Sequence, residues 1–149
     1  MNILVIEDDI QMLKLYKDWL SDILTSFSFT SPTVVSFLTN GKEADSVLNN
    51  SDIKYDITFL DIVLPGMSGV ELYNKHLATL GDVVVSSSYG ARFQEGAHIP
   101  DHTEKLFILN KPFNKDDLRN RVSSLLRNKG VKENVDSSGT GTSQKYKVI

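Results

Sequence analysis

The sequence contains no cysteine, and its charge is nearly balanced. Without thiols the chain forms neither disulfides nor thiolate zinc sites, and its 149 residues are enough to bury an ordinary hydrophobic core. The formal net charge of −3 has the wrong sign for a protein that binds the nucleic-acid backbone through Lys and Arg. We therefore expect one globular domain with no direct nucleic-acid partner.

Long apolar runs and targeting signals are also missing. The chain starts with a short apolar run that has no basic leader and stops at Glu7-Asp8-Asp9, unlike a secretory signal. No apolar run approaches the roughly 18–20 residues that a membrane-spanning helix needs. These absences predict a cytoplasmic protein without membrane insertion.

The sequence does contain a regular alternation of short apolar runs and helical patterns. The apolar runs cover residues 3–6, 34–38, 57–60, 83–85 and 106–109. Each run is apolar almost throughout, which is typical of strands covered on both faces of a parallel sheet. The pattern therefore predicts five parallel strands.

Amphipathic helices are predicted between and after these runs. The clearest has apolar residues at three- and four-residue steps from Met12 to Phe27. Another begins at Asn114, with Asp117 in a capping-box arrangement. Shorter or weaker helices are predicted over residues 44–48, 70–77 and 88–104.

This order of elements predicts a doubly wound, three-layer α/β sandwich with about five helices. The folded domain is expected to cover residues 1–128. From about Asn134 the chain is rich in Ser, Gly and Thr, so residues 129–149 are expected to form a flexible tail. In this architecture ligands bind outside the carboxyl ends of the strands, so a site is expected among the residues that follow them.

Acidic, hydroxyl and basic residues follow the predicted strands. They are Glu7-Asp8-Asp9, Asp61, Ser86-Ser87-Ser88 and Asn110-Lys111-Pro112. Carboxylates that lie together repel one another unless they share a cation, and Mg²⁺ prefers such oxygen ligands. A lysine and a hydroxyl beside them are suited to holding a phosphoryl group. The set therefore predicts phosphoryl transfer onto one of the chain's own carboxylates.

Each of these residues alone has a simpler interpretation. The acidic run can be a solvated turn that caps the next helix, and Asp9 is expected to do only that. Lys111 can be an exposed lysine before a proline, and the serines can be polar turn residues. The combination at matching strand ends favours the phosphoryl-transfer site.

Together these motifs resemble the receiver domain of two-component response regulators. The resemblance covers residues 1–128 and is carried by residues 3–9 and 61–69, by the hydroxyl after the fourth strand and by Lys111-Pro112-Phe113. It implies a flavodoxin-like five-stranded parallel sheet in the order 2-1-3-4-5. It also implies a stand-alone signalling protein that is not an enzyme, beyond its own phosphoryl transfer and autodephosphorylation. Its partners would be a sensor histidine kinase or a histidine phosphotransfer protein, and a downstream protein that the sequence does not name.

The resemblance also implies the roles of the acidic residues. Asp61 would accept the phosphoryl group. Mg²⁺ would be bound by Asp8, by Asp61 and by the backbone carbonyl of Val63, with Glu7 acting mainly through water.

The remaining roles fall on the fourth and fifth strand ends. Lys111 would pair with the phosphoryl oxygens, and its bond to Pro112 is expected to be cis, a form that only X–Pro bonds adopt cheaply. Ser87 would be the switch hydroxyl. Ser86 is the alternative, because spacing alone does not distinguish the two.

One departure from the receiver pattern keeps a second hypothesis open. Ile108 stands three residues before Lys111, where the family usually has a Tyr or Phe whose inward rotation reports phosphorylation. The alternative is a pseudo-receiver that binds partners without phosphorylation. A flavodoxin-like cofactor carrier is disfavoured, because the acidic loop after the first strand would repel a nucleotide phosphate.

Overall fold

The computed structural model describes residues 1–88, 105–134 and 147–149 of the chain. Its centre is a parallel sheet in the order β6-β5-β4-β1-β3-β8. The strands are β1 (Asn2–Ile6), β3 (Val34–Leu38), β4 (Ile57–Asp61), β5 (Asp82–Ser87), β6 (Leu106–Asn110) and β8 (Lys147–Val148). The first five in this list are the predicted strands, and their order β3-β1-β4-β5-β6 confirms the predicted doubly wound topology.

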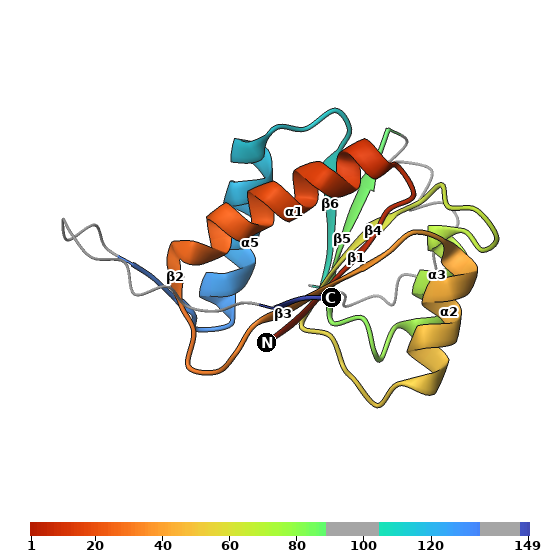
Figure 1. Ribbon diagram of the computed structural model, residues 1–149, viewed down its shortest axis with the longest axis horizontal. Coiled ribbons are helices and arrows are strands. Elements are labelled where there is room, and N and C mark those ends of the chain that lie inside the picture. Colours follow the sequence, from red (N-terminus) through yellow and green to blue (C-terminus); the bar gives the residue numbers. More distant parts are fainter. Residues whose placement is uncertain (89–104, 135–146) are drawn as a thin grey trace.

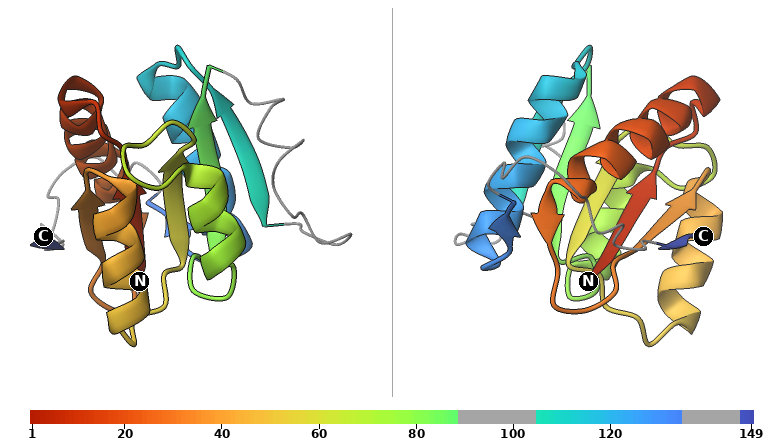
Figure 2. Two further views of the ribbon diagram at one scale, coloured as in Figure 1. Left: turned by 90° about the vertical axis from the view of Figure 1, so that its right-hand side faces the viewer. Right: turned by 60° about the vertical axis from the view of Figure 1, so that its left-hand side comes forward.

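Helices cover both faces of this sheet, as Figures 1 and 2 show. They are α1 (Ile10–Thr25), α2 (Gly41–Asn50), α3 (Gly69–His76) and α5 (Lys115–Asn128). The pair α1 and α5 lies on one face, and α2 and α3 lie on the other. The helix predicted in residues 88–104 falls on a segment of which residues 89–104 lie outside the described part. Among the helices of the described part, none is long and apolar enough to cross a membrane.

Successive residues of the central strands point into two different cores. Val5, Phe59 and Val84 belong to the core under α1 and α5. Their neighbours Leu60 and Val85 belong to the core under α2 and α3. Because both faces are buried, these strands read as continuous apolar runs in the sequence.

The two long helices begin where their capping residues predict. The Asp9 side chain accepts a hydrogen bond from the backbone N–H of Met12, 2.9 Å away, and so caps α1. Asn114 and Asp117 form the predicted capping box at the start of α5. Gly130, with φ of 77°, follows α5 in the left-handed conformation that often ends a helix.

A second, two-stranded sheet joins the ends of α1 and α5. It pairs β2 (Phe27–Ser28) with β7 (Lys132–Glu133) in antiparallel fashion. The predicted helix extended to Phe27, but α1 ends at Thr25, because the Ser26 N–H bonds back to the carbonyl of Ile23 and the chain then becomes extended. Phe27 keeps its predicted burial from this strand position.

The C-terminal segment also takes part in the main sheet. In β8, Lys147 lies opposite Val34 of β3. The Phe37 N–H donates to the carbonyl of Ile149 at 3.2 Å. A flexible tail was expected over residues 129–149, and the pairings of β7 and β8 were not predicted. Residues 135–146 lie outside the described part.

Candidate functional site

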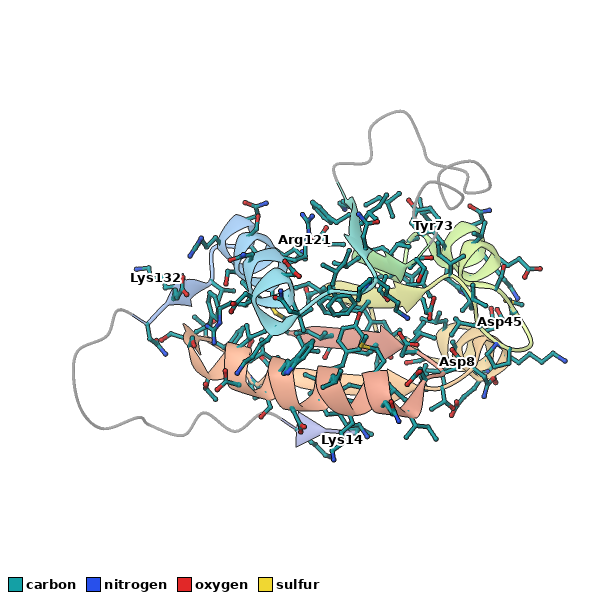
Figure 3. The ribbon with its side chains drawn as sticks, turned by 90° about the horizontal axis from the view of Figure 1, so that it is seen from above. Asp8, Lys14, Asp45, Tyr73, Arg121 and Lys132 are labelled. Carbon is teal, nitrogen blue, oxygen red and sulfur yellow. The ribbon has the colours of Figure 1, made fainter. Side chains whose placement is uncertain are left out.

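Three carboxylates meet at the carboxyl end of the sheet. β1 and β4 are parallel neighbours, with Ile6 opposite Leu60, so Glu7 follows level with Asp61. One carboxylate oxygen from each of Glu7, Asp8 and Asp61 lies within 4.8 Å of the others. Glu7 and Asp61 are buried and Asp8 is exposed; Figure 3 shows Asp8 at the end toward which the strands point. The structure thus brings together the three predicted acidic residues.

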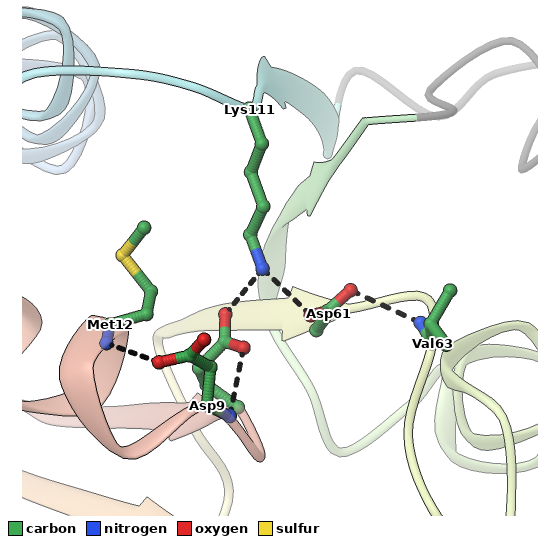
Figure 4. Close-up of polar contacts among 6 residues, drawn as sticks. Asp9, Met12, Asp61, Val63 and Lys111 are labelled. Atoms are coloured by element: carbon green, nitrogen blue, oxygen red, sulfur yellow. Dashed lines mark hydrogen bonds and ion pairs between the residues drawn. The ribbon is translucent and has the colours of Figure 1, made fainter.

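Lys111 enters this cluster from the end of β6 and bridges two of the carboxylates. Its Nζ lies 2.7 Å from Oε2 of Glu7 and 2.7 Å from Oδ2 of Asp61 (Figure 4). The Lys111 N–H donates to the carbonyl of Ser87 at 3.0 Å, which fixes the lysine beside β5. The Lys111–Pro112 bond is cis, as predicted. A positive charge therefore lies where the sequence predicted it.

Burial and charge shift the protonation of this group of residues. The pKa of Glu7 is raised from 4.5 to about 7. Burial is the main cause, the hydrogen bond from Lys111 opposes it, and the charge of Asp61 adds to it. Burial alone lowers the pKa of Lys111, but its hydrogen bonds to Asp61 and Glu7 outweigh that effect and raise it. The lysine thus stays charged at neutral pH, whereas Glu7 gains or loses its proton around pH 7.

The loop after β4 holds the Asp61 side chain from the other side. The Val63 N–H donates to Oδ1 of Asp61 at 3.1 Å. The Gly69 N–H donates to the carbonyl of Ile62 at 2.9 Å, and Ser68 caps α3. Asp61 is therefore oriented by both its neighbouring loop and Lys111, while the predicted role of the Val63 carbonyl as a metal ligand stays a prediction.

Gly69 lies against the backbone of Asp61, where the loop has no room for a side chain. A Cβ atom at Gly69 would lie 2.1 Å from the backbone carbonyl oxygen of Asp61. We therefore expect Gly69→Ala to displace the loop and to lower the free energy of unfolding by about 2–3 kcal/mol. Urea denaturation measures this loss.

Gly130→Ala is the matched control for that variant. Its Cβ would meet no atom within 4 Å, but φ is 77°, so only backbone strain of about 1 kcal/mol is expected. If the two variants lost the same stability, steric contact with the Asp61 carbonyl would not explain the role of Gly69.

Ser86 and Ser87 end β5, and both are buried. The sheet register places Ser86 opposite Asp61. Ser86 interacts with the hydroxyl of Tyr16, which lies in the core under α1. Ser87 is the last strand residue, and its carbonyl accepts the bond from Lys111. Both serines adjoin the acidic residues, and the choice of Ser87 as switch hydroxyl stays a prediction.

Sequence reasoning missed one polar group at this site, the hydroxyl of Tyr16. The helical pattern predicted Tyr16 as a core residue, and its exposed fraction of 1% confirms that. The pattern did not show that its hydroxyl lies near Glu7 and Asp61, whose charges act on it. The available signal was a phenol about two helical turns after Asp8 in an otherwise apolar stripe.

Comparisons with known proteins find the same architecture elsewhere. A CheY-like response regulator receiver domain protein from Methanospirillum hungatei is 21% identical, with a TM-score of 0.63 over 87% of this chain and 95% of that chain. The response regulator protein TrrA from Thermotoga maritima, in complex with Mg(2+)-BeF, is 24% identical, with a TM-score of 0.61 over 84% and 98%. The receiver domain of the hybrid histidine kinase CckA is 22% identical, with a TM-score of 0.62 over 85% and 99%.

These structural likenesses show the fold, and the family follows from a sequence match. A comparison with curated proteins finds no match. Residues 3–123 match the response regulator receiver domain family, which is most of the chain. The chain therefore belongs to the response regulator receiver domain family.

Proposed function

We propose that this receiver domain accepts a phosphoryl group from a phosphohistidine and that Asp61 is the acceptor. The donor is a sensor histidine kinase or a histidine phosphotransfer protein in the cytoplasm. The observation that carries the proposal is the placement of Asp61 beside two further carboxylates, with the Lys111 ammonium 2.7 Å from its Oδ2 atom. Such a group binds a divalent cation and a phosphoryl group at the same time.

The acidic residues have the donor set that Mg²⁺ prefers. Their carboxylate oxygens converge within 4.8 Å, and a few carboxylates leave coordination positions for water and phosphate oxygens. We assign Asp8, Asp61 and the Val63 carbonyl as direct ligands and Glu7 as a ligand through water. When bound, Mg²⁺ neutralises charge on the transferring phosphoryl group.

The residues of the chain position the reaction and balance its charge. One carboxylate oxygen of Asp61 attacks phosphorus, and the bond between phosphorus and the donor's imidazole nitrogen breaks with its electron pair on that nitrogen. Lys111 pairs with the phosphoryl oxygens, and the Val63 N–H, 3.1 Å from Oδ1 of Asp61, orients the carboxylate. The product is an acyl phosphate on Asp61.

We propose that the new phosphoryl group then changes a protein-binding surface. It adds a charge of about −1.5 to −2, which attracts Lys111 and the hydroxyl of Ser87. Shifting a two-state equilibrium from 1:99 to 99:1 takes about 5.5 kcal/mol, which a few charge-assisted hydrogen bonds of about 1.5–3 kcal/mol each supply. We place this functional unit in residues 1–128, with residues 129–149 as its tail.

A pseudo-receiver that binds partners without phosphorylation is the second candidate. Ile108 favours it, because an aliphatic side chain stands where an aromatic switch residue is expected. The acidic residues and Lys111 favour the phosphoacceptor, because a constitutive binding module has no use for three converging carboxylates with an ammonium 2.7 Å from two of them.

Intact-mass measurement after incubation with acetyl phosphate and Mg²⁺ distinguishes the two candidates. We expect the wild type to gain the mass of one phosphoryl group, and we expect no gain for Asp61→Asn or when Mg²⁺ is chelated. No gain in the wild type would support the pseudo-receiver. An equal gain in Asp61→Asn would mean that another residue is the acceptor.

A further inference from the structure

The hydroxyl of Tyr16 is a buried polar group that the proposed chemistry leaves without a role. Tyr16 is 1% exposed, and its ring packs against Phe59 and Phe113 with centroid distances of 5.5 and 5.8 Å. Within the described residues, the Tyr16 hydroxyl has no hydrogen bond of regular geometry. A phenylalanine would make the same ring contacts without burying an unsatisfied hydroxyl, so packing alone does not explain the tyrosine.

The strand geometry places this hydroxyl beneath the acidic residues. Asp61 follows Phe59 on the same face of β4, the face covered by α1 and α5. The register puts Ser86 of β5 opposite Asp61, and Ser86 is the residue that interacts with the Tyr16 hydroxyl. Ser86 therefore lies between the hydroxyl of Tyr16, with which it interacts, and Asp61, which it faces across the two strands.

The Tyr16 hydroxyl can serve as a donor toward Ser86. A phenol has an ordinary pKa of about 10 and so keeps its proton at physiological pH. A serine hydroxyl both accepts and donates, so Ser86 can receive the bond from Tyr16 and direct its own proton toward the carboxylate.

We propose that Tyr16 is a positioning residue of the phosphorylation site, which orients Asp61 for attack through the hydroxyl of Ser86. This inference rests on the proposed function. Tyr16 touches neither the donor nor the metal. It therefore affects how often the Asp61 carboxylate is correctly oriented, and so the rate of the reaction, and leaves the binding of the phosphodonor unchanged.

Kinetics of phosphorylation by acetyl phosphate with Mg²⁺ test the proposal. Tyr16→Phe removes one oxygen and keeps the ring. We expect the maximal rate to fall about 3- to 10-fold, the range for loss of one hydrogen bond, with the half-saturating donor concentration unchanged. Ser86→Ala should show the same loss. The double variant should be no slower than either single variant, because both changes break the same connection.

Two controls separate positioning from packing. The melting temperature of Tyr16→Phe and the fluorescence of Trp19, the single tryptophan, whose ring centroid lies 6.3 Å from that of Phe113, should match the wild type. Tyr55 is also a buried tyrosine that interacts with a serine, Ser36, but it belongs to the opposite core, so Tyr55→Phe should not change the rate.

A wild-type rate in Tyr16→Phe, or losses that multiply in the double variant, would overturn the inference while leaving the acceptor role of Asp61 intact. A wild type that takes up no phosphoryl group would instead overturn the proposed function, and this inference with it.

Discussion

Replacing Lys111 by methionine is expected to lower the free energy of unfolding by about 3 kcal/mol at about pH 8 in the absence of divalent cations. The Nζ of Lys111 lies 2.7 Å from both Glu7 and Asp61, and its side chain is only 18% exposed. Its removal leaves two adjacent buried carboxylates without this ammonium. The same variant is expected to lose phosphoryl uptake, because the phosphoryl oxygens lose their cationic partner.

The loss of stability in Lys111→Met should depend on pH in a defined direction. Burial raises the pKa of Glu7 and the hydrogen bond from Lys111 lowers it, with a net value of about 7, so removing the lysine raises this pKa further. The folded protein then binds more protons than the unfolded chain above pH 4.5, and its stability falls as the pH rises. The variant should therefore be closest to the wild type at about pH 5.

Urea denaturation over a range of pH measures this effect. Lys75→Met is the control, because Lys75 also pairs with an aspartate, Asp45, at 2.8 Å but is 48% exposed. That variant should lose less than about 1 kcal/mol. Equal losses in the two variants, or a loss in Lys111→Met that does not vary with pH, would contradict the described electrostatics.

Glu7→Gln is expected to make the metal-free protein more stable by about 1–2 kcal/mol at about pH 8. Glu7 is 1% exposed, and its pKa is raised from 4.5 to about 7. The wild type should therefore lose stability as the pH rises from 4.5 through about 7, whereas glutamine has no charge to bury. Lys111 keeps Asp61 as a partner in this variant, at 2.7 Å, so the loss of one ion pair is partly offset.

Addition of Mg²⁺ should reverse that order of stability. A cation that binds only the folded state stabilises it more when its affinity is higher, and the wild type has one more carboxylate near the metal. Thermal denaturation with and without Mg²⁺ measures both effects. Glu43→Gln, at an exposed glutamate in the first turn of α2, should gain nothing in either condition. A wild-type stability that is flat between about pH 5 and 8 would contradict the raised pKa of Glu7.

Much of the candidate site was predictable because parallel strands end at the same edge. Glu7, Asp8, Asp61 and Lys111 each follow an apolar run, so the fold class alone brings them together once the strand order is known. The caps of the two long helices were predictable for a local reason, because a capping side chain bonds to backbone groups within three residues.

The features that the sequence did not predict depend on contacts between distant segments. β7 and β8 are two-residue strands whose residues show no apolar pattern, and their pairing is set by the segments beside them. A helical pattern placed Tyr16 in the core but does not report where the end of a long side chain reaches. Ser86 and Ser87 are neighbours in the sequence, so their side chains point to opposite faces of the sheet. Which of them shares a face with Asp61 depends on the register of β5 against β4.

Chemical trapping of the phosphorylated residue tests the central claim most directly. Borohydride reduces the acyl phosphate of an aspartate to homoserine, and peptide mass spectrometry then locates the change. After incubation with acetyl phosphate and Mg²⁺, we predict homoserine at position 61 and at no other aspartate. Homoserine at Asp8, phosphate retained on a serine or histidine, or no modification under conditions where a known receiver domain reacts would contradict the assignment of Asp61 as the phosphoacceptor.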